Sequence, residues 1–230
     1  MLFREEDEDL EALPFADRTD AGRILASKLS GYSGRKNVVV LGLSRGGMPV
    51  AAAVAGVLRV PLDVLVVIKV GTPWNTELAM GAVAEGDVQV LNLSMVNELC
   101  VSDQDVEGVT SAARRELEIR ERIYRCGHPP FDLQGTTVIL VDDGIATGCS
   151  ILAAITAVRR RGATRVVVGV PVAPASGYRA IQMEADEVIS VAQPDIFLAV
   201  SQWYRDFTPV SDEDVQWLLE NTMSPMPSAA

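Results

Sequence analysis

The sequence predicts an open α/β fold, with a mainly parallel twisted sheet flanked by helices. Short apolar runs rich in valine, leucine and isoleucine recur along the 230 residues, and helical patterns separate them. Such runs are typical of strands buried on both faces, as in a parallel sheet. Alternating strands and helices imply right-handed crossovers that cover both faces of one sheet. The length suits a single domain of this kind.

The elements follow in a regular order. Asp20 is the expected N-cap of the first helix, and Gly162 is the expected C-cap of the helix that begins near Ile151. A hairpin is expected across Gly86 and Asp87. The expected strands are 37–43, 62–70, 81–84, 88–91, 138–141, 166–172 and 187–191. The expected helices are 20–30, 47–58, 102–124, 151–161 and 176–185.

The two ends of the chain differ from its middle. Residues 1–16 are acidic and read as an N-terminal arm, 17–220 as the folded domain, and 221–230 as a flexible tail. The arm lacks the apolar centre of a signal peptide, and no apolar run reaches the length of a membrane span. We therefore expect a cytoplasmic protein without membrane association.

Composition narrows the function further. A formal net charge of -11 argues against a nucleic-acid-binding surface. The three cysteines show no paired spacing, which favours a reduced compartment. Cys126 and His128 lack further soft ligands, so a zinc site is not expected there. A metal is expected instead as Mg²⁺ carried by a substrate phosphate.

The segment from Val138 to Ser150 contains the main functional signal. A buried strand runs into Asp142 and Asp143, and small residues then open a helix. Ligands bind at the carboxyl ends of strands in open α/β sheets, and a helix N-terminus favours an anion. The pair of carboxylates can accept hydrogen bonds from a sugar diol while the small residues hold a phosphate. An Asp-Asp-Gly turn that only caps the helix is the structural alternative. No Walker loop or Gly-x-Gly-x-x-Gly fingerprint is present.

This segment resembles the phosphoribosyl pyrophosphate (PRPP) signature of type I phosphoribosyltransferases: apolar residues, an acidic pair, variable residues and Thr-Gly. The resemblance implies that Asp142 and Asp143 bind the ribose hydroxyls and contact Mg²⁺ through water. It also implies a 5′-phosphate loop formed by Ala146, Thr147, Gly148, Cys149 and Ser150.

Two further loops fit the same family. Ser44-Arg45-Gly46-Gly47 resembles the pyrophosphate loop, which in many members contains a non-proline cis peptide, here expected at Ser44–Arg45 or Arg45–Gly46. An ordinary glycine turn is the alternative. Lys69 matches the second residue of the family's Arg-Lys pair, whereas Ile68 replaces the first. Arg45 and Lys69 are the expected catalytic cations, beside the two aspartates.

An aromatic segment near the C-terminus resembles the hood that clamps a nucleobase, and we place it at about residues 192–215. Trp203, Tyr204 and Asp206 are the predicted base-binding residues, although these aromatic side chains suit a core equally well. In family members that act on 6-oxopurines, an Asp precedes the Thr-Gly. Ala146 stands at that position here, so the acceptor is not predicted.

The resemblance spans residues 15–220 and includes a bacterial group of predicted phosphoribosyltransferases. It implies transfer of the phosphoribosyl group of PRPP to a nitrogenous base, Mg²⁺ as cofactor, and a homodimer. A regulatory protein that binds PRPP or a nucleotide without turnover is the alternative, because Ile68 removes one cation. A purely structural role would predict no PRPP affinity. The charged helix 102–124 is expected to be solvated, and the alternative is a lid or a dimer contact.

Overall fold

The computed structural model describes residues 14–125 and 129–222, and the statements below concern these residues. Five parallel strands form the central sheet in the order β2-β1-β6-β7-β8. Their bounds are Val38–Leu43 (β1), Leu62–Leu65 (β2), Thr137–Val141 (β6), Arg165–Val172 (β7) and Glu187–Ala192 (β8). β2, the next strand of this sheet along the chain, pairs with one side of β1, and β6 pairs with the other side. The topological switch point is therefore between β1 and β6, which is where ligands bind in such sheets.

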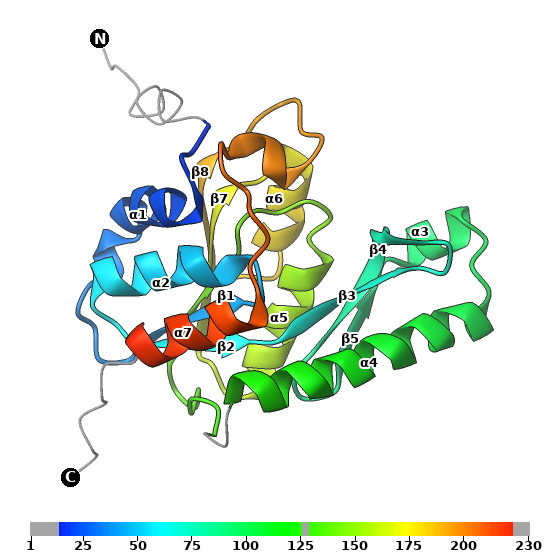
Figure 1. Cartoon of the computed structure of the whole chain (residues 1–230), viewed down its shortest axis with the longest axis horizontal. Coiled ribbons are helices and arrows are strands. Elements are labelled where there is room, and N and C mark those ends of the chain that lie inside the picture. Colours follow the sequence, from blue (N-terminus) through cyan, green and yellow to red (C-terminus); the bar gives the residue numbers. More distant parts are fainter. Residues whose placement is uncertain (1–13, 126–128, 223–230) are drawn as a thin grey trace.

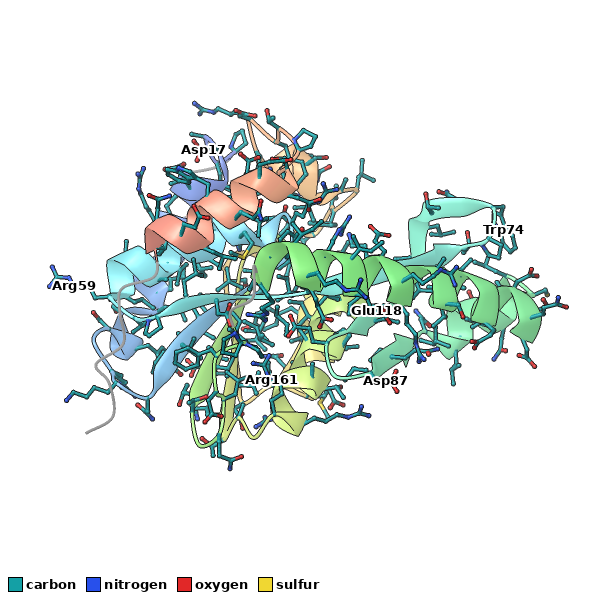
Figure 2. The ribbon with its side chains drawn as sticks, turned by 60° about the horizontal axis from the view of Figure 1, so that its bottom comes forward. Asp17, Arg59, Trp74, Asp87, Glu118 and Arg161 are labelled. Carbon is teal, nitrogen blue, oxygen red and sulfur yellow. The ribbon has the colours of Figure 1, made fainter. Side chains whose placement is uncertain are left out.

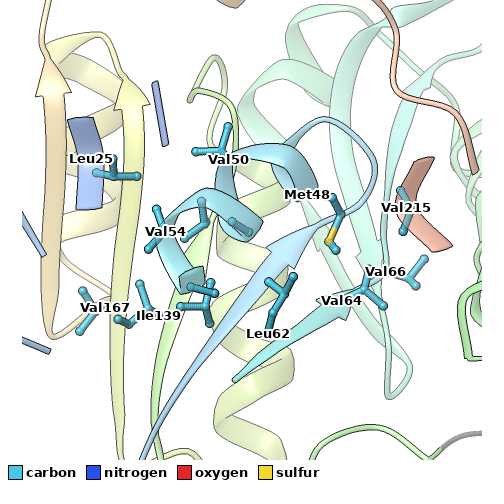
Figure 3. Close-up of a cluster of buried hydrophobic side chains, with 14 of the residues drawn as sticks. Leu25, Met48, Val50, Val54, Leu62, Val64, Val66, Ile139, Val167 and Val215 are labelled. Carbon is cyan, nitrogen blue, oxygen red and sulfur yellow. The ribbon is translucent and has the colours of Figure 1, made fainter. Parts of the chain in front are cut away.

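Helices cover both faces of this sheet, which confirms the predicted fold class (Figure 1). One face carries α1 (Arg18–Lys28), α2 (Gly47–Leu58) and α7 (Asp212–Thr222). The other carries α5 (Cys149–Arg160) and α6 (Ala175–Gln182). The sequence did not predict α7, whose Val215 joins the core beside α2 (Figure 3).

Alternating side chains of the strands build a separate apolar core on each face. Val38 and Val40 of β1 face α1 and α2, whereas Val39 and Leu41 face α5. Leu25, Met48 and Val54 fill the first core, together with residues from all five strands of the central sheet. Figure 3 shows part of this cluster. Burial on both faces explains why the strands read as continuous apolar runs.

The first helix begins earlier than predicted. Its N-cap is Asp17, whose carboxylate accepts the Asp20 amide at 2.8 Å. The Asp20 carboxylate instead accepts the amide of Ala16, the residue before the N-cap, at 3.0 Å. Aspartate is a residue type that favours the N-cap, but Asp20 occupies the third helical position. Arg18 thereby becomes the first helical residue.

The predicted strand 62–70 is wrong, because it is two strands in two sheets. β2 ends at Leu65, and β3 (Val67–Thr72) pairs with β4 (Asn75–Ala84) in an antiparallel sheet completed by β5 (Val88–Leu91). The intervening Val66 donates its amide to the buried carboxylate of Glu85 at 2.9 Å. Every residue from 62 to 68 is buried, so the apolar run conceals the break. The hairpin across Gly86 and Asp87 is confirmed.

This small sheet and α4 (Asp103–Arg125) form an arm that projects from the body (Figure 1). Ser102 caps α4 by accepting the Asp105 amide at 3.1 Å. Trp74 lies at the far end of the arm, whereas Asp17 lies on the body (Figure 2). A short helix, α3 (Leu93–Glu98), was not predicted. α4 was expected to be solvated, or a lid or dimer contact, but one of its faces packs against β3 and α7. The buried residues of this helix are Thr110, Ala113, Leu117 and Tyr124.

Several predictions concern residues at or beyond the limits of the two described segments. Of the predicted arm, residues 14–16 are described, and Phe15 is buried in a strand-like bridge to Tyr204. Cys126, His128 and most of the predicted tail lie outside the described residues. Within residues 14–125 and 129–222, no helix is long and apolar enough to cross a bilayer.

Candidate active site

Asp142 and Asp143 lie immediately after β6, at the carboxyl edge of the sheet and beside the switch point. The Asp142 carboxylate accepts the amide of Asp143 at 2.9 Å. The main-chain carbonyl of Asp143 accepts the Tyr204 hydroxyl at 2.6 Å. These bonds fix the backbone that presents the two carboxylates.

The loop from Ser44 to Gly47 lies directly against this pair. The Ser44–Arg45 peptide is cis, at one of the two predicted bonds. A Cβ atom on Gly46 would lie 2.3 Å from Oδ2 of Asp143, and one on Gly47 would lie 2.7 Å from the main-chain oxygen of Val141. Only glycine fits at these two positions, because any side chain would displace the carboxylates or the strand end.

The predicted phosphate loop opens α5. Gly148 is the N-cap with φ 79°, a left-handed conformation that favours glycine, and Cys149 is the first helical residue. Ile145 anchors the loop, because its buried side chain joins the core and its amide donates to Val172. Ala146 and Thr147 are exposed, and Cys149 is buried. The N-terminus of this 12-residue helix, which directly follows the exposed Ala146 and Thr147, is suited to an anion.

Arg45 and Lys69 come from separate sheets. Arg45 follows β1, and Lys69 is an exposed residue of β3. The ammonium group of Lys69 lies close enough to act electrostatically on Asp142. The structure therefore places Lys69 within electrostatic range of Asp142, although the two residues belong to different sheets.

Ile68 points to the opposite face of β3 from Lys69. It is 5% exposed and joins the apolar cluster that contains Leu117 and Tyr124 of α4. The missing cation of the family pattern is thus replaced by a core residue beneath α4.

Arg120 lies on the same inward stripe of α4, between Leu117 and Tyr124, and its side chain is 18% exposed. Burial, together with a hydrogen bond to Asp212, raises the pKa of Tyr124, while Arg120 and Arg45 act in the opposite direction. Both guanidinium groups are therefore near Tyr124. The spacing of three residues from Leu117 could have identified Arg120 in the sequence.

The two carboxylates have different electrostatic environments. Burial, reinforced by the neighbouring Asp143, raises the pKa of Asp142 to about 7. Asp143 is paired with Arg18, whose Nε donates to Oδ2 at 2.9 Å. Asp142 is therefore poised to exchange a proton near neutral pH.

Arg18 is a site residue that the sequence did not predict. Besides Asp143, it donates through Nη1 to the carbonyl of Thr208 at 2.8 Å, and its guanidinium lies 3.7 Å above the Phe207 ring. In the sequence Arg18 is only an arginine that follows the helix cap Asp17. Arginines are common at solvated helix ends, so this position does not indicate a site.

The predicted base-binding residues occupy different positions. Tyr204 is buried, its ring packs between Phe15 and Phe207, and its hydroxyl is bonded to Asp143. This is an anchoring position, unlike the base-stacking position expected from the sequence. Trp203 is half-buried and stacks on Phe197 at 6.5 Å between ring centroids. Asp206 is exposed and bonds to Thr208. Trp203 and Asp206 remain the predicted contacts for an acceptor.

The model of the phosphoribosyl transferase domain family matches residues 16–208. The chain belongs to this family. Two Mycobacterium tuberculosis proteins with the provisional name phosphoribosyl transferase, Rv0571c and MT0597, are 45% identical to it over 206 residues, which is 90% of the chain. The chain spans about half the length of these relatives, because the match covers 46% of each.

A solved structure shares both sequence and fold. TT1426 from Thermus thermophilus is 42% identical, with a TM-score of 0.74 over 91% of this chain and 99% of that one. AQ2163 from Aquifex aeolicus shares the fold, with 10% identity and a TM-score of 0.50 over 83% of this chain and 84% of that one. The type I phosphoribosyltransferase fold expected from the sequence is thus confirmed.

Proposed function

We propose that this chain is a phosphoribosyltransferase that uses PRPP and Mg²⁺, transfers the 5-phosphoribosyl group to a nitrogenous base and releases pyrophosphate. One observation carries the proposal. The carboxylate pair lies between a glycine loop that packs onto it and the N-terminus of α5, all at the switch point of the sheet. Family membership supports the same chemistry.

In this proposal Asp142 and Asp143 accept hydrogen bonds from the ribose 2′ and 3′ hydroxyls. The 5′-phosphate binds residues 146–150 through main-chain amides and the hydroxyls of Thr147 and Ser150. The base nitrogen forms a bond to C1 as the bond from C1 to the pyrophosphate oxygen breaks, with inversion and oxocarbenium character. Arg45, Gly46, Gly47 and Lys69 bind the departing pyrophosphate. Catalysis is then mostly positioning and charge neutralisation.

The residues present fit a metal that arrives with the substrate. Among the described residues, no cluster of three or more His, Cys, Asp or Glu side chains is placed to hold a metal ion. Mg²⁺ usually keeps several waters and needs only one or two carboxylates beside substrate phosphates. Asp142 and Asp143 would hold it, through water. When bound, the ion supplies positive charge to the leaving group.

Arg120 is our candidate for the cation that Ile68 does not provide. It lies on the α4 face that covers Ile68, near Tyr124 and hence in the neighbourhood of Arg45. Its partner Glu116 lies one turn earlier on the same helix, with 50% of its side chain exposed. An arginine in such a pair can exchange a solvated carboxylate for a pyrophosphate oxygen.

The second candidate function is a regulator that binds PRPP or a nucleotide without turnover, which Ile68 favours. A panel of bases separates the two. With PRPP and Mg²⁺ present, a phosphoribosyltransferase releases pyrophosphate with at least one base, whereas a regulator binds PRPP and releases none. Absence of millimolar PRPP binding by calorimetry would sink both. A cytoplasmic homodimer is part of the same proposal, and sedimentation tests the dimer.

A further inference from the structure

We propose that Arg18 is a positioning residue that joins the hood to the ribose site through Asp143. This inference rests on the proposed function, since it assigns Asp143 to the ribose hydroxyls. Arg18 supplies the only described contact in which one side chain bonds both to a carboxylate of the PRPP motif and to the hood.

The geometry of Arg18 is specific to this role. Its planar guanidinium bonds to Asp143 through Nε and to Thr208 through Nη1, while its face covers Phe207. Lysine cannot reproduce these contacts, because it is a point charge on a flexible stem. The Arg18 and Asp143 side chains are only 10% and 14% exposed. A buried ion pair is weak grounds for stability, so a role at the site explains its position better.

The pair leaves one oxygen of Asp143 for a ligand. Oδ2 accepts Arg18, and among the described residues Oδ1 accepts no hydrogen bond. The bond from Arg18 to Oδ2 holds the carboxylate in one orientation, with Oδ1 left to accept a hydroxyl proton. Arg18 therefore prepares Asp143 for a diol before any ligand binds.

The hood is attached to Asp143 in two ways. Its Tyr204 hydroxyl holds the main chain of Asp143, and its Thr208 carbonyl holds Arg18. The hood also pairs with residues 15 and 16, because the amides of Arg205 and Asp206 donate to Phe15 and Ala16. Phe15 and Ala16 precede Arg18 by only a few residues. Ribose binding at Asp143 should therefore tighten the hood through Arg18.

Hydrogen exchange of the ligand-free protein tests the link directly. In an Arg18→Gln variant, the amides of Arg205 and Asp206 should exchange about tenfold faster, since one charge-assisted hydrogen bond is lost. Arg159→Gln is the matched control, because it breaks an ion pair with Asp186 at the opposite edge of the sheet. Unchanged exchange in Arg18→Gln, or equal acceleration in the control, would overturn the proposal.

PRPP with Mg²⁺ provides the second arm. In the parent, the ligand should slow exchange of the hood amides. In Arg18→Gln, PRPP affinity should fall about tenfold, and saturating PRPP should no longer protect the hood. Arg18→Lys should recover PRPP affinity without recovering hood protection. Lysine restores the positive charge but not the planar guanidinium that bonds to Asp143 and Thr208 together. Hood protection that persists in Arg18→Gln contradicts the proposal. If the parent does not bind PRPP, the proposed function fails, and the ligand-free arm still decides the link.

Discussion

Gly47 and Asp142 meet backbone to backbone. A Cβ atom on Gly47 would lie 2.8 Å from the Cα of Asp142 and 3.0 Å from its Oδ1. The Ser44–Gly47 loop and the carboxylate pair are therefore in direct contact, without an intervening side chain. Each holds the other in place.

Replacing Gly47 tests this contact. Gly47→Ala should destabilise the fold by about 1–3 kcal/mol and weaken PRPP binding, because the methyl group displaces the end of β6. Gly56→Ala, in the same helix but with nothing within 4 Å of the added atom, should be neutral or stabilise by about 0.5–1 kcal/mol. Urea unfolding and calorimetry measure both effects. Equal behaviour of the two variants would show that the contact is unimportant.

Asp142 should make the ligand-free protein less stable as pH rises. Its folded pKa is raised above the unfolded value of 3.8 to about 7, so the folded state binds more protons between these pH values. Stability is lost as pH rises through this window and is constant above it. Asp142→Asn removes the effect, and should gain about 2 kcal/mol relative to the parent between pH 5 and pH 8. Parallel urea midpoints for the two proteins across this range would contradict the assignment.

PRPP binding should release a proton near neutral pH. The ribose hydroxyls need an ionised acceptor, and Asp142 is partly protonated at pH 6 to 7 because its pKa is about 7. Affinity should therefore rise with pH through about 7. Calorimetry at pH 6.5 in buffers of different ionisation enthalpy measures the proton directly. A binding enthalpy that does not depend on the buffer would remove Asp142 from this role.

A variant with the family's arginine at position 68 should be less stable than the parent. Ile68→Arg places a charge beneath α4 and should destabilise the fold by about 3 kcal/mol. Lys69→Gln, on the exposed face of the same strand, should leave stability nearly unchanged and weaken pyrophosphate binding. Thermal unfolding with and without pyrophosphate separates the two. A stable Ile68→Arg protein would mean that the side chain can reach solvent from this strand.

Arg120 and Arg122 form a matched pair for testing the additional cation. Each pairs with a glutamate one turn earlier, but the Arg120 side chain is 18% exposed and that of Arg122 is 79% exposed. Arg120→Gln should weaken pyrophosphate binding by about tenfold, because a charge-assisted hydrogen bond is lost, whereas Arg122→Gln should have little effect. Pyrophosphate inhibition of PRPP binding measures the difference. Equal inhibition constants would exclude Arg120 from the site.

The sequence predicted what local pattern encodes. The apolar run before Asp142 and the small residues after it identify a strand, a site and a helix start within one segment. It did not predict Arg18, because that role depends on contacts with residues 125 and 190 positions away. Tyr204 was assigned to the acceptor for a similar reason: an aromatic residue with a polar end suits a site or an anchor, and only tertiary structure distinguishes them.

The division of residues 62–72 between two sheets has a mechanical consequence. Asp142 belongs to the body and Lys69 to the arm, with Val66 as the residue between the two strands. Glu85 holds that residue through its amide, and also binds Arg125 and Arg161. A shift at this junction would move Lys69 and Trp74 in the same direction relative to the body. Trp74 would move farther, because it lies farther from the junction. The position of Lys69 relative to Asp142 therefore depends on how the arm sits on the body.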